Sequence, residues 1–256
     1  MRAAALILVA ACGRSGFDTI DAAGDATPVI DVASDAAVPI QFDASTSTTA
    51  VNASTLSWPH AITGADPILF VAVSDRTNAM AGTPPMVASV TYGSAPLQRV
   101  TFTQPAGSLD NLELWVLAAP GQGTAPVTVT LMAATAGESA IAISYTGVVQ
   151  TNPLDRSGAT FLSNTTSIDL SWMTNAPHAW AVAAAMDQGG FAMAFSPGTA
   201  QTSRQLNVID AQNFEIQSAA DQADVAAPSN VDFHWTSTQA SATWCAVGAS
   251  FIPAGG

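Results

Sequence analysis

The sequence predicts an all-β protein, a two-sheet antiparallel β-sandwich of jelly-roll type that follows a disordered N-terminal leader. Beyond Ser45 apolar and polar residues alternate with a period of two, and helical spacing is hard to find. Turn signals rich in glycine and proline, such as residues 120–123 and 196–198, separate the alternating stretches. Strand and turn together take roughly 12 to 18 residues, with no second linker and no convincing internal repeat. We therefore expect residues 46–256 to form a single sandwich domain.

The first part of the chain, residues 1–11, has the features of a lipoprotein signal peptide. Arg2 gives a short positive start, and residues 3–11 form an apolar segment that is too short to span a membrane. Residues 9–12 (VAAC) resemble the lipobox of bacterial lipoproteins, which implies that Cys12 is the lipid attachment site and the first residue of the mature chain. The alternatives are an ordinary cleaved signal peptide with a chance cysteine, or a misassigned start codon.

This resemblance also implies a location. The several acyl chains that such lipoproteins carry, palmitate among them, exceed the marginal binding of one chain, so anchoring to the membrane is expected to be permanent. Lipoproteins kept in the inner membrane often carry Asp after the cysteine, whereas this chain has Gly13. We therefore expect lipid anchoring at the outer membrane or cell surface of a Gram-negative bacterium.

Residues 12–45 are predicted to form an acidic, disordered tether. Their composition of Ala, Pro, Ser and Asp offers little apolar surface to bury. A flexible chain of this length reaches on the order of 30 Å, which would hold the domain clear of the lipid headgroups. The acidic residues of this segment are Asp18, Asp21, Asp25, Asp31, Asp35 and Asp43.

The strands are expected from the start of the domain onwards. Residues 68–73 (ILFVAV) are continuously apolar, which suits a central strand covered on both faces. Residues 126–131 and 139–145 alternate, as half-buried strands do. The other expected strands are residues 50–58, 87–92, 97–103, 112–118, 167–173, 179–186, 191–195, 205–209, 214–219, 231–237 and 242–252.

Six of these stretches together resemble a family of bacterial extracellular β-sandwich modules. The resemblance covers roughly residues 50–253 and rests on structural motifs, namely strands, turn glycines and buried aromatic residues. It implies a secreted or surface-anchored protein and carries over no catalytic or ligand-binding residue. The acidic leader resembles those of myxobacteria-like Gram-negatives. The stretches are residues 68–74 (ILFVAVS), 87–93 (VASVTYG), 112–120 (LELWVLAAP), 127–130 (VTVT), 144–148 (SYTGV) and 244–251 (WCAVGASF).

Charge excludes some function classes. The chain carries six Lys or Arg against 19 Asp or Glu, for a formal charge of −13 and a pI of about 4.1. All six basic residues are arginines, so chemistry that requires a lysine is excluded. A nucleic-acid partner is also excluded, because it requires clustered cations.

Cysteine and histidine give no catalytic or metal-binding pattern. Cys245 lies in an apolar stretch and is expected to be a buried, inert thiol. His60, His178 and His234 are far apart in sequence and form no zinc motif, so each is expected at the surface or at a sheet edge. No cofactor is predicted. A structural calcium ion held by loop carbonyls and one or two Asp would leave no sequence signal.

The acidic residues of the domain could form the carboxylate pair of a glycosidase, but nothing in the sequence pairs them. Solvation at the surface is the expected state of all seven. They are Asp110, Glu113, Glu138, Asp155, Asp169, Asp187 and Asp232.

Tryptophans would stack on sugars if they were exposed. Alternation assigns Trp115, Trp172, Trp180, Trp235 and Trp244 to buried faces. Trp58 stands at the expected end of a strand and is the one tryptophan expected to be partly exposed, which makes it a weak candidate for ligand binding. We therefore predict no platform of several aromatic residues, and a ligand that is met by loops.

Two function classes follow. The first is a lipid-anchored cell-surface binding, adhesion or envelope module without a catalytic site, whose partners are the membrane and a glycan or protein ligand. The alternative is an extracellular, glycan-directed hydrolase with a cleft that is not visible in the sequence. A cleft with two acidic residues, or a Ser/His pair within hydrogen-bond distance, would favour the hydrolase.

Overall fold

The computed structural model describes residues 38–76, 87–105, 110–188, 192–209, 215–238 and 242–255. These residues belong to one compact unit, Asp35–Gly256, and the expected signal peptide and Cys12 lie outside them. Every regular element among them is a β-strand, and none is a helix that could cross a membrane. The all-β prediction is confirmed.

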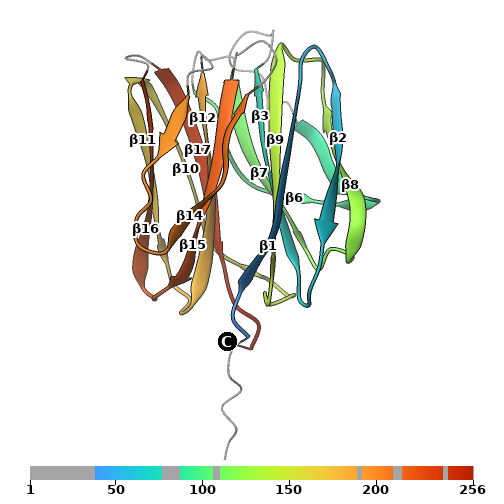
Figure 1. Cartoon of the computed structure of the whole chain (residues 1–256), viewed down its shortest axis with the longest axis vertical. Coiled ribbons are helices and arrows are strands. Elements are labelled where there is room, and N and C mark those ends of the chain that lie inside the picture. Colours follow the sequence, from blue (N-terminus) through green and yellow to red (C-terminus); the bar gives the residue numbers. More distant parts are fainter. Residues whose placement is uncertain are drawn as a thin grey trace, which may run out of the picture. The chain divides into compact units, whose positions relative to one another are not determined.

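The first half of the fold runs from β1 to β9, and the second half from β10 to β17 (Figure 1). The first half contains β1 (Gln41–Ala50), β2 (Thr55–Ile62), β3 (Ile68–Arg76), β4 (Val87–Tyr92), β5 (Ala95–Pro96), β6 (Gln98–Thr103), β7 (Asp110–Ala118), β8 (Gly123–Leu131) and β9 (Gly137–Thr146). The second half contains β10 (Leu154–Thr165), β11 (Ser167–Thr174), β12 (Ala179–Gln188), β13 (Met193–Phe195), β14 (Gln201–Ile209), β15 (Glu215–Val225), β16 (Ser229–Ser237) and β17 (Ala242–Phe251).

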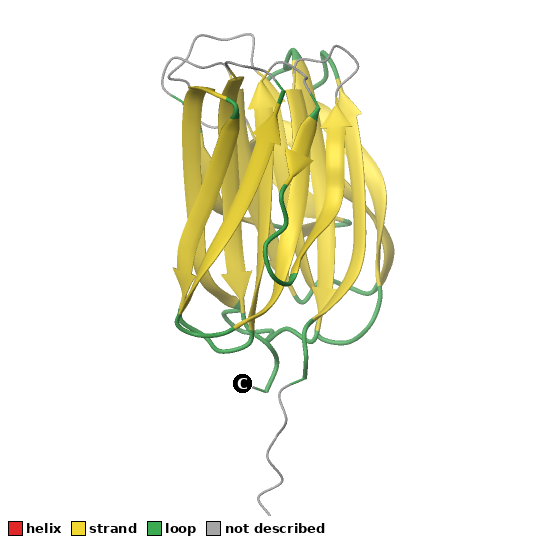
Figure 2. Cartoon of the chain, turned by 60° about the vertical axis from the view of Figure 1, so that its left-hand side comes forward, coloured by secondary structure: helices red, strands yellow, loops and turns green. Residues whose placement is uncertain are grey.

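The strands form four antiparallel sheets. The first half contributes the sheets β1-β9-β3-β7-β6 and β2-β8-β4-β5, and the second half contributes β10-β17-β12-β15-β14 and β11-β16-β13. In each half the two sheets face each other with the strand order of a jelly roll. The expected sandwich packing is present, but as two sandwiches in one compact unit rather than one. Figure 2 shows that the strands run between two ends that carry the loops.

Three apolar layers hold the four sheets together. The five-stranded sheets of the two halves pack on each other in the middle, and each is covered on its other face by the smaller sheet of its own half. Burial therefore differs between inner and outer strands: eight of the nine residues of β3 are buried, whereas buried and exposed residues alternate along β2. The continuous apolar run at residues 68–73 is thus explained by a strand with a sheet on both sides.

The second half repeats the topology of the first. Its strands occur in the same order in equivalent sheets: β10, β17, β12, β15 and β14 stand where β1, β9, β3, β7 and β6 stand in the first half. The pairing registers then define equivalent residues. Asp75 of β3 lies opposite Asn111 and Glu138, and Asp187 of β12 lies opposite Ile216 and Trp244. The sequence analysis found no repeat because the two halves share few side chains at equivalent positions.

The halves are related by a pseudo-two-fold axis. Strand β6 packs against β10, and the equivalent β14 packs against β1; likewise β7 packs against β17, and β15 against β9. Each contact between the halves therefore occurs twice with the roles exchanged, as at the interface of a symmetric dimer. We call the β6/β10 contact the first seam and the β1/β14 contact the second seam.

Two edge strands correct the sequence analysis. Strand β1 already begins at Gln41, and Ile40 before it is buried, so the expected tether boundary at Ser45 lies too far along the chain. Strand β10 was not predicted at all. Each of the two strands is rich in polar residues and pairs with a single neighbour, so its sequence resembles a loop.

Candidate functional site

Trp58, the weak ligand candidate of the sequence analysis, is buried. Its side chain is 6% exposed, belongs to the apolar layer of the first half, and donates from Nε1 to Thr46 Oγ1 at 3.0 Å. The expectation of partial exposure is wrong because β2 continues to Ile62, which places Trp58 in the middle of the strand. Trp180, which was expected in the core, is the half-buried tryptophan instead.

His60 is also buried rather than at the surface. Its Nδ1 lies 2.8 Å from Thr46 Oγ1, and its Nε2 lies 3.0 Å from Ser144 Oγ. Ser144 donates to Asp43 Oδ2 at 2.8 Å. Ser144 gives its one hydroxyl proton to Asp43, so it can only accept from His60, which places the proton of His60 on Nε2 and leaves Nδ1 to accept from Thr46. Burial lowers the pKa of His60, against the opposing effect of nearby Asp43, which favours this neutral form.

The second half contains the same arrangement with another ring. Trp172, the sixth residue of β11 as His60 is of β2, donates from Nε1 to Ser250 Oγ at 3.3 Å. Ser250 donates to Asp155 Oδ2 at 3.2 Å. The backbone amide of Asn175 also donates to Asp155, as that of Thr63 does to Asp43. We call each set a ring–serine–aspartate strut.

The struts bear on the hydrolase alternative. His60 and Ser144 are the Ser/His pair within hydrogen-bond distance that a hydrolase would need, but both are buried. An indole has no basic nitrogen, so Trp172 cannot act as a general base at the equivalent position. The feature that both halves share is a chain of a donor, a hydroxyl and a carboxylate, which joins β2 to β9 in the first half and β11 to β17 in the second.

The structure brings several acidic residues together at one end of the first half. Asp75 lies opposite Glu138 on one side and Asn111 on the other, and Glu113 follows Asn111 on the same face of β7. All four side chains are at most 1% exposed. Asn111 Nδ2 lies 2.8 Å from Glu113 Oε1 and 3.3 Å from Asp75 Oδ2. We call these four residues the carboxylate cluster; Asp110, which is also buried, lies next to it.

Partners of the carboxylate cluster are few among the residues that the structure describes. Arg99 approaches Glu113 at 3.5 Å, while Asp75 Oδ1 and Glu138 Oε1 have no hydrogen-bond partner within this part of the chain. Burial raises the pKa of Glu138 to about 7, against the hydrogen bond from Thr135. It raises the pKa of Asp75 well above its usual value. The cluster therefore holds protons at a pH where exposed carboxyl groups have lost them.

The other predicted acidic residues lie apart. Asp187, equivalent to Asp75, is buried, and burial raises its pKa to about 7 against a hydrogen bond with Ser237. Asp169 pairs with His234 at the surface, and Asp232 is exposed. In the part of the chain that the structure describes, no three His, Cys, Asp or Glu side chains are placed so that they could hold a metal ion. Surface solvation was the wrong expectation for Asp110, Glu113, Glu138 and Asp187.

The remaining candidates are simpler. Cys245 is 0% exposed in the central apolar layer, as predicted. His178 is exposed and pairs with Asp224, and the partly exposed His234 lies on the outer sheet of the second half. The lipid attachment site, Cys12, lies outside the described residues.

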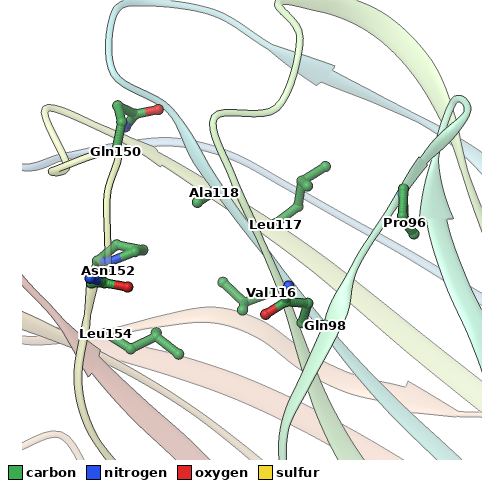
Figure 3. Close-up of a pocket in the computed structure, with 9 residues that line it drawn as sticks. Pro96, Gln98, Val116, Leu117, Ala118, Gln150, Asn152 and Leu154 are labelled. Carbon is green, nitrogen blue, oxygen red and sulfur yellow. The ribbon is translucent and has the colours of Figure 1, made fainter.

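A pocket of about 380 Å³ opens along the first seam between the halves (Figure 3). Its apolar floor includes Val116 and Leu154, and none of the described residues that line it is charged. Gln150 and Asn152 border it from the segment that joins the halves, and Gln98 from β6 on the other side (Figure 3). We call it the amide pocket after these three carboxamides.

Two of the carboxamides are available to a ligand. Gln150 donates from Nε2 to Val148 O at 2.6 Å. The side chains of Gln98 and Asn152 are exposed and have no hydrogen-bond partner among the described residues. Polar groups with open bonding capacity around an apolar floor are typical of ligand pockets.

The pseudo-two-fold axis explains why this seam is open. At the second seam the guanidinium of Arg204 covers the ring of Phe42 at 4.0 Å and pairs with Asp221 at 2.6 Å. The equivalent residues of the first seam are Val100, Leu154 and Val116, because β6 and β14 have the same bulge beside their partner strands. Smaller side chains without an ion pair leave the space that forms the pocket.

Leu154 also borders a second cavity, of about 400 Å³, that continues along the same seam. This cavity is lined by charged residues, among them Arg99, Asp155 and Arg156. The first seam thus carries a groove with a neutral part and a charged part. Sequence reasoning missed it because β10, which forms one wall, was not predicted and the packing partner of β6 is not encoded locally.

Comparison of the chain with protein-family models gave no match, and comparison with curated proteins gave none either.

Proposed function

We propose that the protein is a lipid-anchored binding module of the bacterial cell surface, and that it holds a neutral, hydroxyl-rich ligand such as an oligosaccharide in the amide pocket. The observation that carries the proposal is the pair of unpartnered carboxamides, Gln98 and Asn152, beside a floor without charges. A carboxamide offers N–H donors and a carbonyl acceptor without a net charge, which matches the hydroxyl groups of a neutral sugar.

The anchor is the second part of the proposal. It is supported by the resemblance of residues 9–12 to a lipobox. The described body begins at Val38, whose backbone amide donates to Ala254 O at 3.0 Å, so the tether would join it beside the C-terminal end. A flexible tether with a reach of about 30 Å would leave the seam accessible to a surface glycan.

Binding is favoured over the hydrolase alternative for two reasons. The Ser144–His60 pair has a counterpart in Ser250–Trp172, which keeps the hydrogen-bond pattern and lacks the base. In addition, His60 is 1% and Ser144 0% exposed, so a substrate cannot reach the pair in this structure. We therefore propose a protein without a catalytic role for these residues.

Binding is tested by applying the full-length chain to an array of neutral and acidic glycans. Gln98→Leu removes one carboxamide, and Asn152→Gly removes the other while keeping the backbone at its φ of 52°. Both variants should lose at least tenfold in affinity for a neutral glycan. Thr202→Val, at the position of β14 equivalent to Gln98, is the matched control and should bind as the wild type does. Absence of any bound glycan, or binding that neither variant changes, would overturn the proposal.

Anchoring is tested by metabolic labelling with palmitate. Cys12→Ala should abolish labelling and leave the precursor uncleaved, whereas Cys245→Ala, at the other cysteine of the chain, should leave labelling unchanged. Mass spectrometry that shows an unmodified Cys12 retained in a soluble mature protein would overturn this part of the proposal.

A further inference from the structure

We infer that a second ligand site lies at the pseudo-equivalent end of the second half, and that it stacks a sugar ring on Trp180. A pocket of about 450 Å³ is present there, lined by Pro39, Ile40, His178, Trp180, Ala223, Asp224 and Pro253. We call it the indole pocket. This inference rests on the proposed function, because it assigns the same class of ligand to another site.

The aromatic wall is Trp180. It is half-buried, whereas the other five tryptophans of the chain are at most 8% exposed. Its ring packs edge-on against Tyr145 with the centroids 5.6 Å apart. Because Trp180 lines the pocket and packs on Tyr145, the exposed part of its ring offers an apolar surface on which a sugar can stack.

The polar rim is a His–Asp pair. His178 Nδ1 lies 2.7 Å from Asp224 Oδ1, and both side chains are mostly exposed. The other carboxylate oxygen, Asp224 Oδ2, has no hydrogen-bond partner among the described residues and can accept from a ligand hydroxyl. The chain carries a charge of −13, so a neutral ligand is favoured over an anionic one.

The first half serves as an internal control for what the fold requires. There the position of Trp180 is taken by Ile68, which is fully buried. His178, with a φ of 56°, corresponds to Asp66, with a φ of 50°. Likewise Asp224, with a φ of 48°, corresponds to Ala119, with a φ of 52°.

The backbone turns are therefore the same in the two halves, while the side chains differ. Asp66 and Ala119 cannot form an ion pair with each other, and Ile68 offers no ring. The left-handed backbone at these positions belongs to the fold, and the Trp–His–Asp combination is an addition that the fold does not require. A half-exposed tryptophan beside an oriented carboxylate is explained by a ligand.

The two pockets correspond to each other. They share two pairs of equivalent positions, Asn152 with Ile40 and Ala118 with Ala223. The pseudo-two-fold axis thus relates an amide-lined site to an indole-lined site in one compact unit. A protein with two such sites would bind two segments of one glycan, or join two glycan chains.

The experiment measures both sites in the full-length chain. Neutral hexasaccharides of glucose, xylose and N-acetylglucosamine are titrated by calorimetry for stoichiometry and by tryptophan fluorescence for contact with the indole. Asp224→Asn keeps the left-handed backbone and removes the charge, and Trp180→Phe keeps the packing on Tyr145 and reduces the stacking surface. Gln98→Leu is the control that leaves the indole pocket intact.

We expect two sugar molecules per chain and a change in tryptophan fluorescence on binding. This change should be absent in Trp180→Phe. In Asp224→Asn it should report an affinity at least fivefold lower than in the wild type. Both variants should still bind one sugar with the wild-type affinity, at the amide pocket, and should bind the second sugar at least fivefold more weakly. Gln98→Leu should retain the fluorescence change. One bound sugar whose affinity depends only on Gln98 would overturn the second site and leave the proposed function standing. Absence of binding to all hexasaccharides, and to the glycan array, would overturn both.

Discussion

His60 and Trp172 occupy equivalent positions in the two halves, and each lies with a ring nitrogen next to a serine hydroxyl of the opposite sheet. The two serines, Ser144 and Ser250, both donate to an aspartate at the first bulge of an edge strand. Rings of different size and basicity therefore serve the same purpose. The strut ties the edge strand and the outer sheet to the central sheet of each half.

The first prediction concerns these struts. Ser144→Ala should lower the free energy of unfolding by about 1–3 kcal/mol, because the buried Nε2–H of His60 loses its acceptor. Ser250→Ala, the matched variant of the second half, should cost a similar amount through Trp172. Urea denaturation measures both values.

A catalytic role for Ser144 would give another result. A serine-reactive fluorophosphonate would then label the wild type and Ser250→Ala but not Ser144→Ala. We expect it to label none of the three proteins, since Ser144 is 0% exposed.

The second prediction concerns the space that each ring occupies. Thr46 pairs with Ala142 across the strands beside His60, and the equivalent pair beside Trp172 is Gly158 and Gly248. A Cβ at Gly248 would lie 2.6 Å from Trp172 Cη2 and 2.9 Å from Val182 O. Gly248→Ala should therefore destabilise the protein by about 1–3 kcal/mol, as overpacking does.

The imidazole of the first half suggests how to relieve this clash. The double variant Gly248→Ala/Trp172→His should lose less free energy of unfolding than the two single variants lose together, because the imidazole leaves the space that the added methyl group needs. Gly121→Ala is the control, since no atom lies within 4 Å of its added Cβ. Thermal unfolding of the four variants completes the comparison, and additive effects of the two changes would contradict the explanation.

The third prediction concerns pH. Burial raises the folded-state pKa of Glu138 and of Asp187 to about 7, above the values of these groups in the unfolded chain. The folded protein then binds more protons than the unfolded chain between about pH 4 and 7, so stability is greatest on the acid side of this window. It should fall as the pH rises through 7. Urea denaturation at pH 5 and pH 8 measures the difference.

Glu138→Gln tests the assignment to one residue. The neutral amide should gain about 1–3 kcal/mol relative to the wild type at pH 8 and little at pH 5, since one pKa unit corresponds to about 1.4 kcal/mol. Asp232→Asn, at an exposed acidic residue, is the control and should follow the wild type. If the stability of Glu138→Gln differed between pH 5 and pH 8 as much as that of the wild type, the carboxylate cluster would not be the cause of the pH dependence.

The fourth prediction concerns cooperativity. The central apolar layer combines side chains of both halves, among them Phe70 and Tyr145 of the first and Val247 and Phe251 of the second. Neither half can expose this layer without losing apolar burial in the other, so the two should unfold in one step. Hydrogen exchange read by mass spectrometry in increasing urea should show peptides from both halves opening together. Two separate steps would show that the halves are independent domains.

Local patterns were sufficient for most strands and for the buried cysteine. The alternation at residues 126–131 identified β8, and Cys245 was correctly placed in the core. Predictions from local patterns failed for a strand at the edge of a sheet and for acidic side chains that are buried. The polar strand β10 resembled a loop, and Glu138 was assigned to the surface because nothing near it in sequence shows the facing sheet.

What the sequence determined by itself is the class of fold and the buried face of alternating strands such as β8 and β11, because the period of side-chain alternation is set by the local backbone. Only the tertiary structure decided that the sandwich occurs twice, since residues 68–73 require a cover on both faces without specifying what covers them. The tertiary structure also determines at which of the two seams a pocket is present. Val100 and Leu154 on one seam, and Arg204 and Phe42 on the other, lie far apart in sequence, and only packing across the pseudo-two-fold axis leaves one seam open and closes the other.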